Sequence, residues 1–256
     1  MTDVLANPRD LAFSALRDRA GNVSARLDSL LGRCRLPPQD RALAMEIALG
    51  VVRRRGTLEA VLRAFLLDPG RALPGPLTAV LEMGLYQLLL LDRVPDFAAV
   101  NEAVEQAARV GHKRKAGLVN GVLRAVARAA GAVEAGAPPL AADAVPVGPW
   151  AFRRMGRAVF ANPAERPDEW LAQAYSLPVE LARRWLGRLG SLERAAAVAA
   201  HGIARPAQVL RVNSLRTDVT GAVEALAAEG VAAAPHANGL SVVLTEHHNV
   251  AALRAG

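Results

Sequence analysis

The chain has 256 residues, of which 52% are hydrophobic and 4% aromatic, and it contains a single cysteine. This length is enough for a sizeable core and favours two small domains over one. The apolar content excludes a disordered chain, and one cysteine excludes a disulfide framework, a cysteine-rich zinc site and a redox pair. The net charge of +7 is uneven, because residues 1–130 hold 19 basic and 13 acidic side chains, whereas residues 131–256 hold 12 and 11. We therefore expect any attraction to a polyanion mainly in the first half.

Membrane association is not expected from the sequence. Asp3 places an acid where the basic region of a signal peptide would begin. The most apolar stretch, Leu77 to Leu91, is shorter than the ~20 residues needed to cross a bilayer, and it contains Glu82 and Gln87. These features predict a cytoplasmic protein with no membrane partner.

Apolar residues at spacings of three and four predict a bundle of six helices in residues 1–130. The expected helices run from Pro8, capped by Asn7, to Gly21; from Pro38 to Gly56; from a Thr57 cap to Leu66; over about 77–88; from Pro95 to Gly111; and around Leu118, Val122 and Val126. Short connections between them favour a compact all-α arrangement in which strands have no obvious place.

The composition changes after residue 130. Residues 131–149 are rich in Ala, Gly and Pro without a regular period, so we predict a linker and domain boundary there. In residues 150–256, helices are expected around Trp170-Leu171, over the series Leu181, Trp185 and Leu189, and from a Ser191 cap to about His201. Two strands, 209–212 and 239–244, flank a helix over 218–230. Strand, helix and strand in this order predict a βαβ or split-βαβ unit of an α+β domain.

Two motifs on consecutive predicted helices carry a family resemblance. Residues 84–124 contain Leu85-Tyr86-Gln87-Leu88, Val94-Pro95, Val100-Asn101-Glu102-Ala103-Val104-Glu105 and Leu118-Val119-Asn120-Gly121-Val122-Leu123. At this spacing they resemble the NusB fold family. That family includes the NusB antitermination factor and the N-terminal domain of bacterial rRNA cytosine-C5 methyltransferases of the RsmB (Sun or Fmu) type. The resemblance implies a mainly α protein, with a NusB-like all-α bundle followed by a small α+β domain of split-βαβ, RRM-like form.

The second half of the sequence favours the methyltransferase branch of this family. Residues 167–171 (PDEWL) and 210–213 (LRVN) resemble the segment that precedes the catalytic domain in these enzymes. One extra residue before Trp170, and His201 where the family more often has Asn, are small departures. The resemblance implies binding to RNA, with 16S rRNA as the expected partner. In the full-length family it also implies S-adenosylmethionine, bound by a Rossmann-like domain that carries two cysteines.

That catalytic domain would begin about where this chain ends. We therefore expect the RNA-binding front half of such an enzyme, or a truncated gene product, inactive by itself and without a cofactor. An alternative is a NusB-like antitermination factor with a C-terminal extension, which leaves the 167–171 and 210–213 segments unexplained. A protein-interaction scaffold is a third alternative, for which the sequence offers no specific feature.

The chemistry of cytosine-C5 methylation has no evident site in this sequence. A Cys thiolate must add to C6 before C5 becomes nucleophilic, yet the one thiol, Cys34, lies in the bundle half and not beside a proline. We expect Cys34 to be a half-buried structural residue. The strands near 209–213 and 239–244 lack the glycine-rich turn of a nucleotide cradle. His247 and His248 are adjacent and lack metal-ligand spacing, so no metal is expected.

Binding residues are therefore the candidates. All but two of the 31 basic residues are arginine, which suits forked contacts with phosphate. The predicted RNA-binding set is Arg9, Arg17, Arg19, Arg53, Arg54, Arg55, Lys113, Arg114, Lys115, Arg211 and Asn213, although Asn213 is equally suited to closing a turn. We predict that Tyr86 is a core residue with a satisfied hydroxyl, and that Asn101, Glu102, Asn120 and Gly121 serve helix packing and hydrogen bonding rather than ligand binding.

Overall fold

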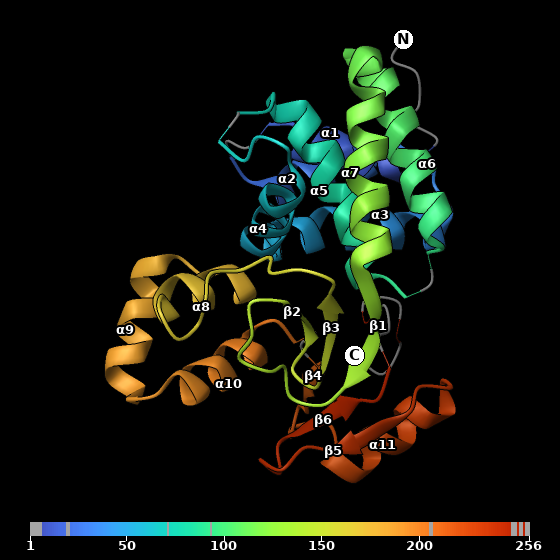
Figure 1. Ribbon diagram of the computed structural model, residues 1–256. Coiled ribbons are helices and arrows are strands. Elements are labelled where there is room, and N and C mark those ends of the chain that lie inside the picture. Colours follow the sequence, from blue (N-terminus) through green and yellow to red (C-terminus); the bar gives the residue numbers. More distant parts are fainter. Residues whose placement is uncertain are drawn as a thin grey trace. The chain divides into compact units, whose positions relative to one another are not determined.

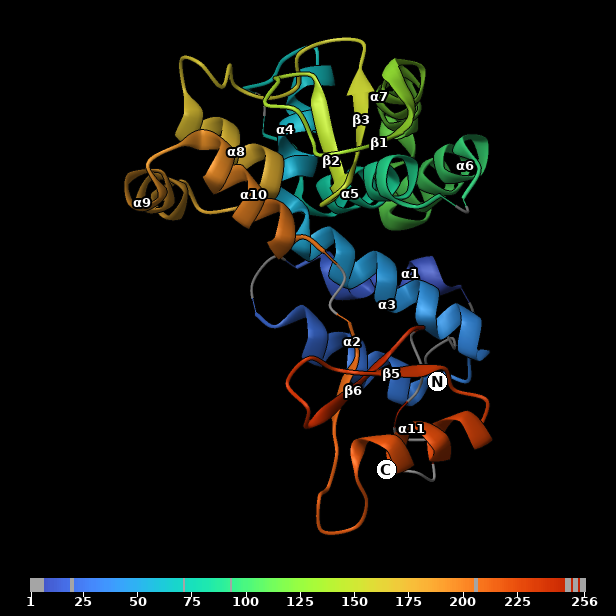
Figure 2. The same ribbon diagram turned by 90° about the horizontal axis from the view of Figure 1, so that it is seen from below.

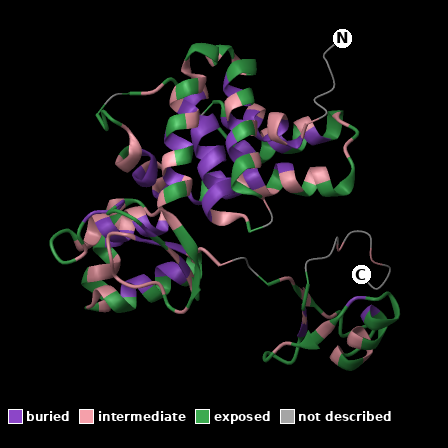
Figure 3. Ribbon diagram, turned by 45° about the vertical axis from the view of Figure 1, so that its right-hand side comes forward, coloured by how far each residue is buried: buried purple, intermediate pink, exposed green. Residues whose placement is uncertain are grey.

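The structure is a computed structural model of the chain, and it describes residues 7–18, 21–70, 72–92, 94–204, 207–246, 250 and 253. The fold divides into two compact units, residues 1–204 and residues 205–256. Each unit has its own buried apolar core, visible as the purple segments of Figure 3. Among the described residues, no helix is both long enough and apolar enough to cross a membrane.

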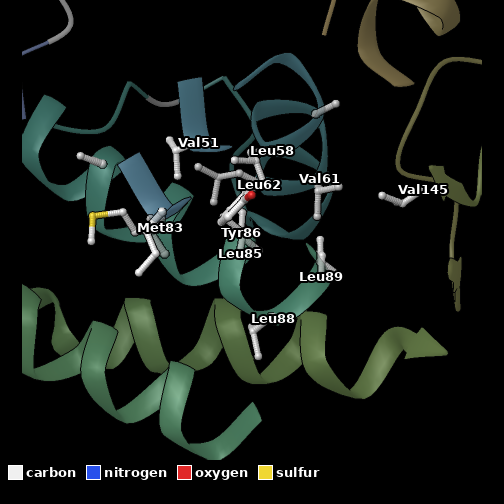
Figure 4. Packing of buried hydrophobic residues seen from close by; sticks show 14 of the residues in the cluster. Val51, Leu58, Val61, Leu62, Met83, Leu85, Tyr86, Leu88, Leu89 and Val145 are labelled. Carbon is white, nitrogen blue, oxygen red and sulfur yellow. The ribbon is translucent and has the colours of Figure 1, made fainter. Parts of the chain in front are cut away.

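The first unit begins with the predicted helical bundle (Figure 1). Its helices are α1 (Pro8–Leu16), α2 (Val23–Arg33), α3 (Pro38–Arg53), α4 (Arg55–Phe65), α5 (Gly75–Leu90), α6 (Asp96–Ala107) and α7 (Ala116–Ala129). The central helix is α5, whose strongly apolar sequence agrees with its position, because nearly every side chain from Leu77 to Leu89 is buried. Figure 4 shows Met83, Leu85, Tyr86, Leu88 and Leu89 of this helix among the core residues. The mainly α fold class expected from the sequence is thus confirmed.

Two details of the bundle differ from the prediction. Helix α2 was not predicted, although Val23, Leu27 and Leu31 are buried at a spacing of four. Thr57 is not a helix cap, because α4 begins at Arg55, directly after the turn that ends α3. Thr57 is instead buried inside α4, where its hydroxyl donates to the carbonyl of Ala174 at 3.0 Å. This hydrogen bond connects the bundle to the helix that contains Ala174, residues 167–175.

The predicted linker is wrong, because residues 130–155 form a sheet that belongs to the first unit. Strands β1 (Ala130–Ala135), β2 (Ala144–Gly148) and β3 (Ala151–Met155) form an antiparallel sheet in the order β1-β3-β2. The mostly small side chains of β1 and β2 hide the alternation by which strands are recognised, whereas the main-chain hydrogen bonds of the ladder do not depend on side-chain size. Val145 is fully buried and joins the core of the bundle.

Three further helices complete the first unit: α8 (Pro167–Tyr175), α9 (Val179–Leu189) and α10 (Leu192–Gly202). The predicted cap is confirmed, because the Ser191 hydroxyl accepts from the backbone N–H of Arg194 at 3.3 Å. Trp170 is fully buried, and its indole N–H donates to the carbonyl of Ala141 at 3.0 Å. The division between units therefore falls after Ala204 and not within 131–149.

The second unit consists of β4 (Val209–Arg211), α11 (Val219–Ala228), β5 (Ala233–Pro235) and β6 (Ser241–Leu244). The strand order is β4-β6-β5 with both neighbouring pairs antiparallel, so β4 and β5 run parallel with β6 between them. This is the predicted split βαβ, with β5 as a strand that the sequence analysis did not identify. Asp218 caps α11 through its carboxylate, which accepts from the N–H of Gly221 at 2.8 Å.

Candidate nucleic-acid interface

The three arginines at the junction of α3 and α4 have different environments. Arg53 is exposed. Arg54 is only 4% exposed and donates from Nη2 to the carbonyl of Pro146, and burial lowers its pKa to about 10. Arg55 is partly buried, with its Nε 4.0 Å from a carboxylate oxygen of the buried Glu82. The buried guanidinium of Arg54 is therefore not accessible for the predicted contact with RNA, and Arg53 is the accessible member of this cluster.

The predicted arginines at α1 also differ in their environments. The Nε of Arg9 donates to the side-chain carbonyl of Gln87 at 2.7 Å, so this guanidinium is engaged in holding α1 to α5. Arg17 ends α1 and is exposed. Arg19 lies outside the described residues.

Tyr86, on α5, is buried as predicted, and its hydroxyl donates to a carboxylate oxygen of Glu46 at 2.8 Å. Burial and that carboxylate raise the pKa of Tyr86.

The connection between α6 and α7 exposes the predicted basic cluster. A π turn over Ala108–His112 contains Gly111 at φ +83°, a left-handed conformation that favours glycine. It leads into a 3-10 turn over Lys113–Lys115. Lys113 and Arg114 are exposed, while Lys115 is partly buried. The kink therefore presents two cations at the tip of the α6–α7 hairpin.

Helix α7 continues this basic surface in a way that the sequence analysis missed. Gly117, Gly121, Arg124 and Arg128 are all exposed and recur at spacings of four, three and four, so they share one face of the helix. Residues 106–133 contain six cations and no acid. The signal that would have identified this face is that spacing, opposite the buried Val119, Val122, Leu123 and Val126. We name Lys113, Arg114, Arg124 and Arg128 the α7 surface.

The cations of the α7 surface have no ion pair with the residues that the structure describes. Arg109 provides the contrast, because its guanidinium lies 3.3 Å from Asp10, 3.9 Å from Glu102 and 3.4 Å from Glu105. Arg109 is thus locally neutralised, whereas the charge of the α7 surface is available to a polyanion. The two glycines within it leave room for close approach, since a Cβ added at either would have no neighbour within 4 Å.

The family-motif residues predicted to serve packing are only partly internal. Glu102 is partly buried and interacts with Arg109, as expected for a structural residue. Asn101 and Gly121 are exposed, so these two residues are not buried between helices, whereas their predicted hydrogen-bonding role stays a prediction. Their exposure places polar and backbone groups on the outer face of the α6–α7 hairpin.

The second unit brings its own predicted residues together. Arg211 and Asn213 line a cavity of about 460 Å³, together with Arg216, which was not predicted. The side-chain carbonyl of Asn213 accepts from the N–H of Leu215 at 3.1 Å, which closes the turn after β4. Asn213 therefore has the structural role that the sequence analysis gave as the alternative, while Arg211 remains exposed beside it.

The described residues form no recognisable binding site for a metal ion or for S-adenosylmethionine. No group of three or more His, Cys, Asp or Glu side chains is placed to hold a metal ion within the described part of the chain. The connection from β4 to α11, residues 212–218, has no glycine, and that from β3 to α8 has Gly156 alone. Neither connection fits the cradle that binds such a cofactor. Cys34 is partly buried against the bundle core, as predicted.

Comparison with known proteins identifies the class to which this architecture belongs. Residues 6–128 match the NusB family, so this part of the chain is a NusB-family domain. Over most of its length the chain is homologous to ribosomal RNA small subunit methyltransferase B. It is 31% identical over 226 residues to the protein named probable ribosomal RNA small subunit methyltransferase B of Bacillus subtilis (strain 168), and 32% identical over 229 residues to ribosomal RNA small subunit methyltransferase B of Xanthomonas campestris pv. campestris.

Both alignments cover 87% of this chain, but only 44% of the Bacillus protein and 47% of the Xanthomonas protein. The chain therefore spans about half the length of the curated relatives it matches. A solved structure, that of PH0851, shares the fold with a TM-score of 0.52 at 14% identity, covering 97% of this chain and 51% of the other. The resemblance recognised in the sequence motifs is confirmed.

Proposed function

We propose that this chain is the RNA-binding portion of an rRNA small-subunit methyltransferase, and that it holds 16S rRNA for methylation at C5 of a cytosine. The observation that carries the proposal is the α7 surface: four cations on a NusB-family domain that are accessible and unpaired among the described residues, in a chain homologous to rRNA methyltransferases. Lysine and arginine contacts with phosphate fix the position of RNA and give salt-dependent affinity.

The chemistry of the reaction supports a division of labour. Methyl transfer to C5 requires a thiolate that adds to C6 and a sulfonium donor, S-adenosylmethionine. Cys34 is partly buried in the bundle, and the described connections do not form a cofactor cradle. We therefore assign binding and positioning of RNA to this chain, and methyl transfer to a part of the enzyme outside these 256 residues. A cytoplasmic location follows from the proposed substrate.

An antitermination factor is the second candidate. The NusB-family domain is compatible with it, but Trp170 and its hydrogen bond to Ala141 build the region after the bundle into the same folded unit. That region also lies within the alignments with the methyltransferases, which cover 87% of the chain. These observations favour the methyltransferase.

A salt titration of the full chain tests the proposal. Affinity for a small-subunit rRNA hairpin is expected to fall linearly with salt concentration on logarithmic axes. Replacing both Arg124 and Arg128 with Gln removes two phosphate contacts and is expected to lower the slope by about 1.5. Arg188→Gln, an exposed residue on α9, is the matched control and should leave the slope unchanged. Absence of binding at low salt would refute the proposal.

A further inference from the structure

A large aromatic ring is exposed at the beginning of α6. Phe97 is 71% exposed, although phenylalanine is normally among the buried residue types. A single exposed phenylalanine is common on protein surfaces. Its significance here depends on which residues lie beside it.

Helices α6 and α7 form an antiparallel hairpin, and the position of Gly84 on α5 fixes their register. A Cβ added to Gly84 would lie 2.7 Å from the side chain of Leu123 and 3.3 Å from that of Ala103, so these two residues lie at the same level. Phe97 is six residues before Ala103, and Ala129 is six residues after Leu123. Phe97 therefore lies level with the last turn of α7, beside Arg128.

The direction of the ring follows from the helix period. Glu102 and Gln106 line a small cavity with Arg9 of α1 and with residues of α5, so this side of α6 faces α1 and α5. Phe97 is nine residues before Gln106, or about two and a half turns, which places it on the opposite side. In Figure 2, α1 and α7 lie on opposite sides of α6. Phe97 is thus on the edge of α6 that borders α7.

The charge beside the ring is positive. Arg124 and Arg128 are exposed on α7, one helical turn or about 6 Å apart along the helix axis. Glu105, an exposed acid of α6, is engaged by Arg109 at 3.4 Å. Asp96 precedes Phe97 in the first turn of α6, so an acid lies next to the ring in the sequence and is expected to oppose part of this charge. An accessible aromatic ring next to two neighbouring cations is complementary to a nucleotide, because the ring can stack on the flat base and the cations can bind the phosphates on each side of it.

We propose that Phe97 stacks on an unpaired base of the bound RNA while Arg124 and Arg128 hold the neighbouring phosphates, so that this end of the α6–α7 hairpin selects single-stranded over duplex RNA. The inference rests on the proposed RNA-binding function and specifies its substrate class. Stacking on an aromatic side chain requires an unpaired base, because the faces of a paired base are covered within the duplex. The cations alone would bind both forms.

Binding of the full chain to a short single-stranded RNA and to a blunt duplex of the same sequence tests this inference. Phe97→Ala is expected to weaken single-strand binding by about 5- to 150-fold, the range that one stacked base provides. Duplex binding and the salt slope for the single strand should stay unchanged. Phe97→Trp should preserve single-strand binding, and Asp96→Asn should strengthen binding to both forms.

Trp150, which is 72% exposed in the turn between β2 and β3, supplies the matched control. Trp150→Ala should change neither affinity. The inference is overturned if Phe97→Ala leaves single-strand binding intact, or weakens both forms equally, while Arg124→Gln still lowers affinity. If the unmodified chain binds neither RNA at low salt, the proposed function itself fails, so the two failures are distinguishable. Unfolding midpoints should be unchanged for these exposed positions.

Discussion

Neighbouring arginines at the junction of α3 and α4 show how strongly burial decides the role of a cation. Arg53 is exposed, whereas Arg54 is buried with its Nη2 bonded to Pro146 and without a hydrogen-bond partner for its Nε among the described residues. A buried guanidinium held by a carbonyl joins two layers of the fold. The sequence places three arginines in a row and contains no feature that separates the one that is buried from the one that is accessible.

This difference predicts a large loss of stability for one of two adjacent substitutions and almost none for the other. Arg54→Ala is expected to lower the free energy of unfolding by about 2–4 kcal/mol, because it leaves a cavity and an unsatisfied buried carbonyl on Pro146. Arg53→Ala, the exposed control, should change it by less than about 0.5 kcal/mol. Urea unfolding of both variants gives the comparison. Equal effects would contradict the buried position of Arg54.

The contact between α4 and α8 depends on a glycine. A Cβ added to Gly56 would lie 3.0 Å from the Cα of Ser176, a backbone atom that cannot move aside independently. Ser176 also has φ +57° and accepts from the N–H of Thr57 at 2.9 Å through its hydroxyl. The two helices can therefore approach closely only while position 56 lacks a side chain.

Replacing two helical glycines with alanine should accordingly change the stability of the fold in opposite directions. Gly56→Ala is expected to destabilise the fold by about 1–3 kcal/mol, because the new methyl group overpacks the contact with α8. Gly121→Ala on α7, where a Cβ meets nothing within 4 Å, should stabilise it by about 0.5–1 kcal/mol through helix propensity. Thermal unfolding of the two variants measures this. Destabilisation by Gly121→Ala would show that the outer face of α7 is covered.

An ion pair between α8 and α9 provides a prediction on pH. The Nε of Arg183 donates to a carboxylate oxygen of Asp168 at 2.7 Å, and this hydrogen bond holds the pKa of Asp168 below its usual value. A lowered pKa in the folded state stabilises the fold above the ordinary pKa of Asp, and that contribution is lost as pH falls through the lowered value. Asp168→Asn should cost less than about 1 kcal/mol at neutral pH, since Arg183 is largely exposed.

Urea unfolding of the Asp168→Asn variant and the unmodified chain, at neutral pH and in acid, measures this contribution. The difference between the two proteins should disappear in acid, where the carboxyl of Asp168 is protonated and as uncharged as the amide that replaces it. A difference that persists below the pKa of Asp168 would show that the substitution acts through packing and not through the lost charge.

Most elements that the sequence predicted have apolar residues at a regular spacing along the chain. Helix α5, with Leu77, Leu81, Leu85 and Leu88 facing the core, follows directly from spacing. Helix α2 carried the same signal in Val23, Leu27 and Leu31, preceded by the capping Asn22. The sheet did not, because β1 is an exposed edge strand of Ala, Gly, Val and Glu that has no apolar face to alternate. Its position depends on pairing with β3, which is a long-range property of the fold.

At the scale of the whole molecule, the NusB-family domain is not an independent body. The sheet contributes Val145 and Met155 to the bundle core, and Arg54 and Thr57 reach from the bundle to Pro146 and Ala174. The family match ends at residue 128, whereas the compact unit extends to residue 204. A family boundary found in sequence is therefore not a boundary of folding here. The candidate site is similarly divided: Lys113 and Arg114 were predicted from sequence, and the spacing of Arg124 and Arg128 along α7 was present in the sequence but not used, whereas Phe97 needed the packing of α6 against α7.

Truncation separates these boundaries. A chain of residues 1–204 should unfold in urea with a midpoint close to that of the first unit in the full chain, because the second unit has its own core. A chain of residues 1–130 should be markedly less stable, since it exposes apolar surface that β2, β3 and α8 cover. The 1–204 chain should also keep the salt-dependent RNA binding of the α7 surface. Loss of RNA binding on removal of residues 205–256 would instead place the principal contact at Arg211. A 1–130 chain as stable as the 1–204 chain would show that the bundle does not need the sheet.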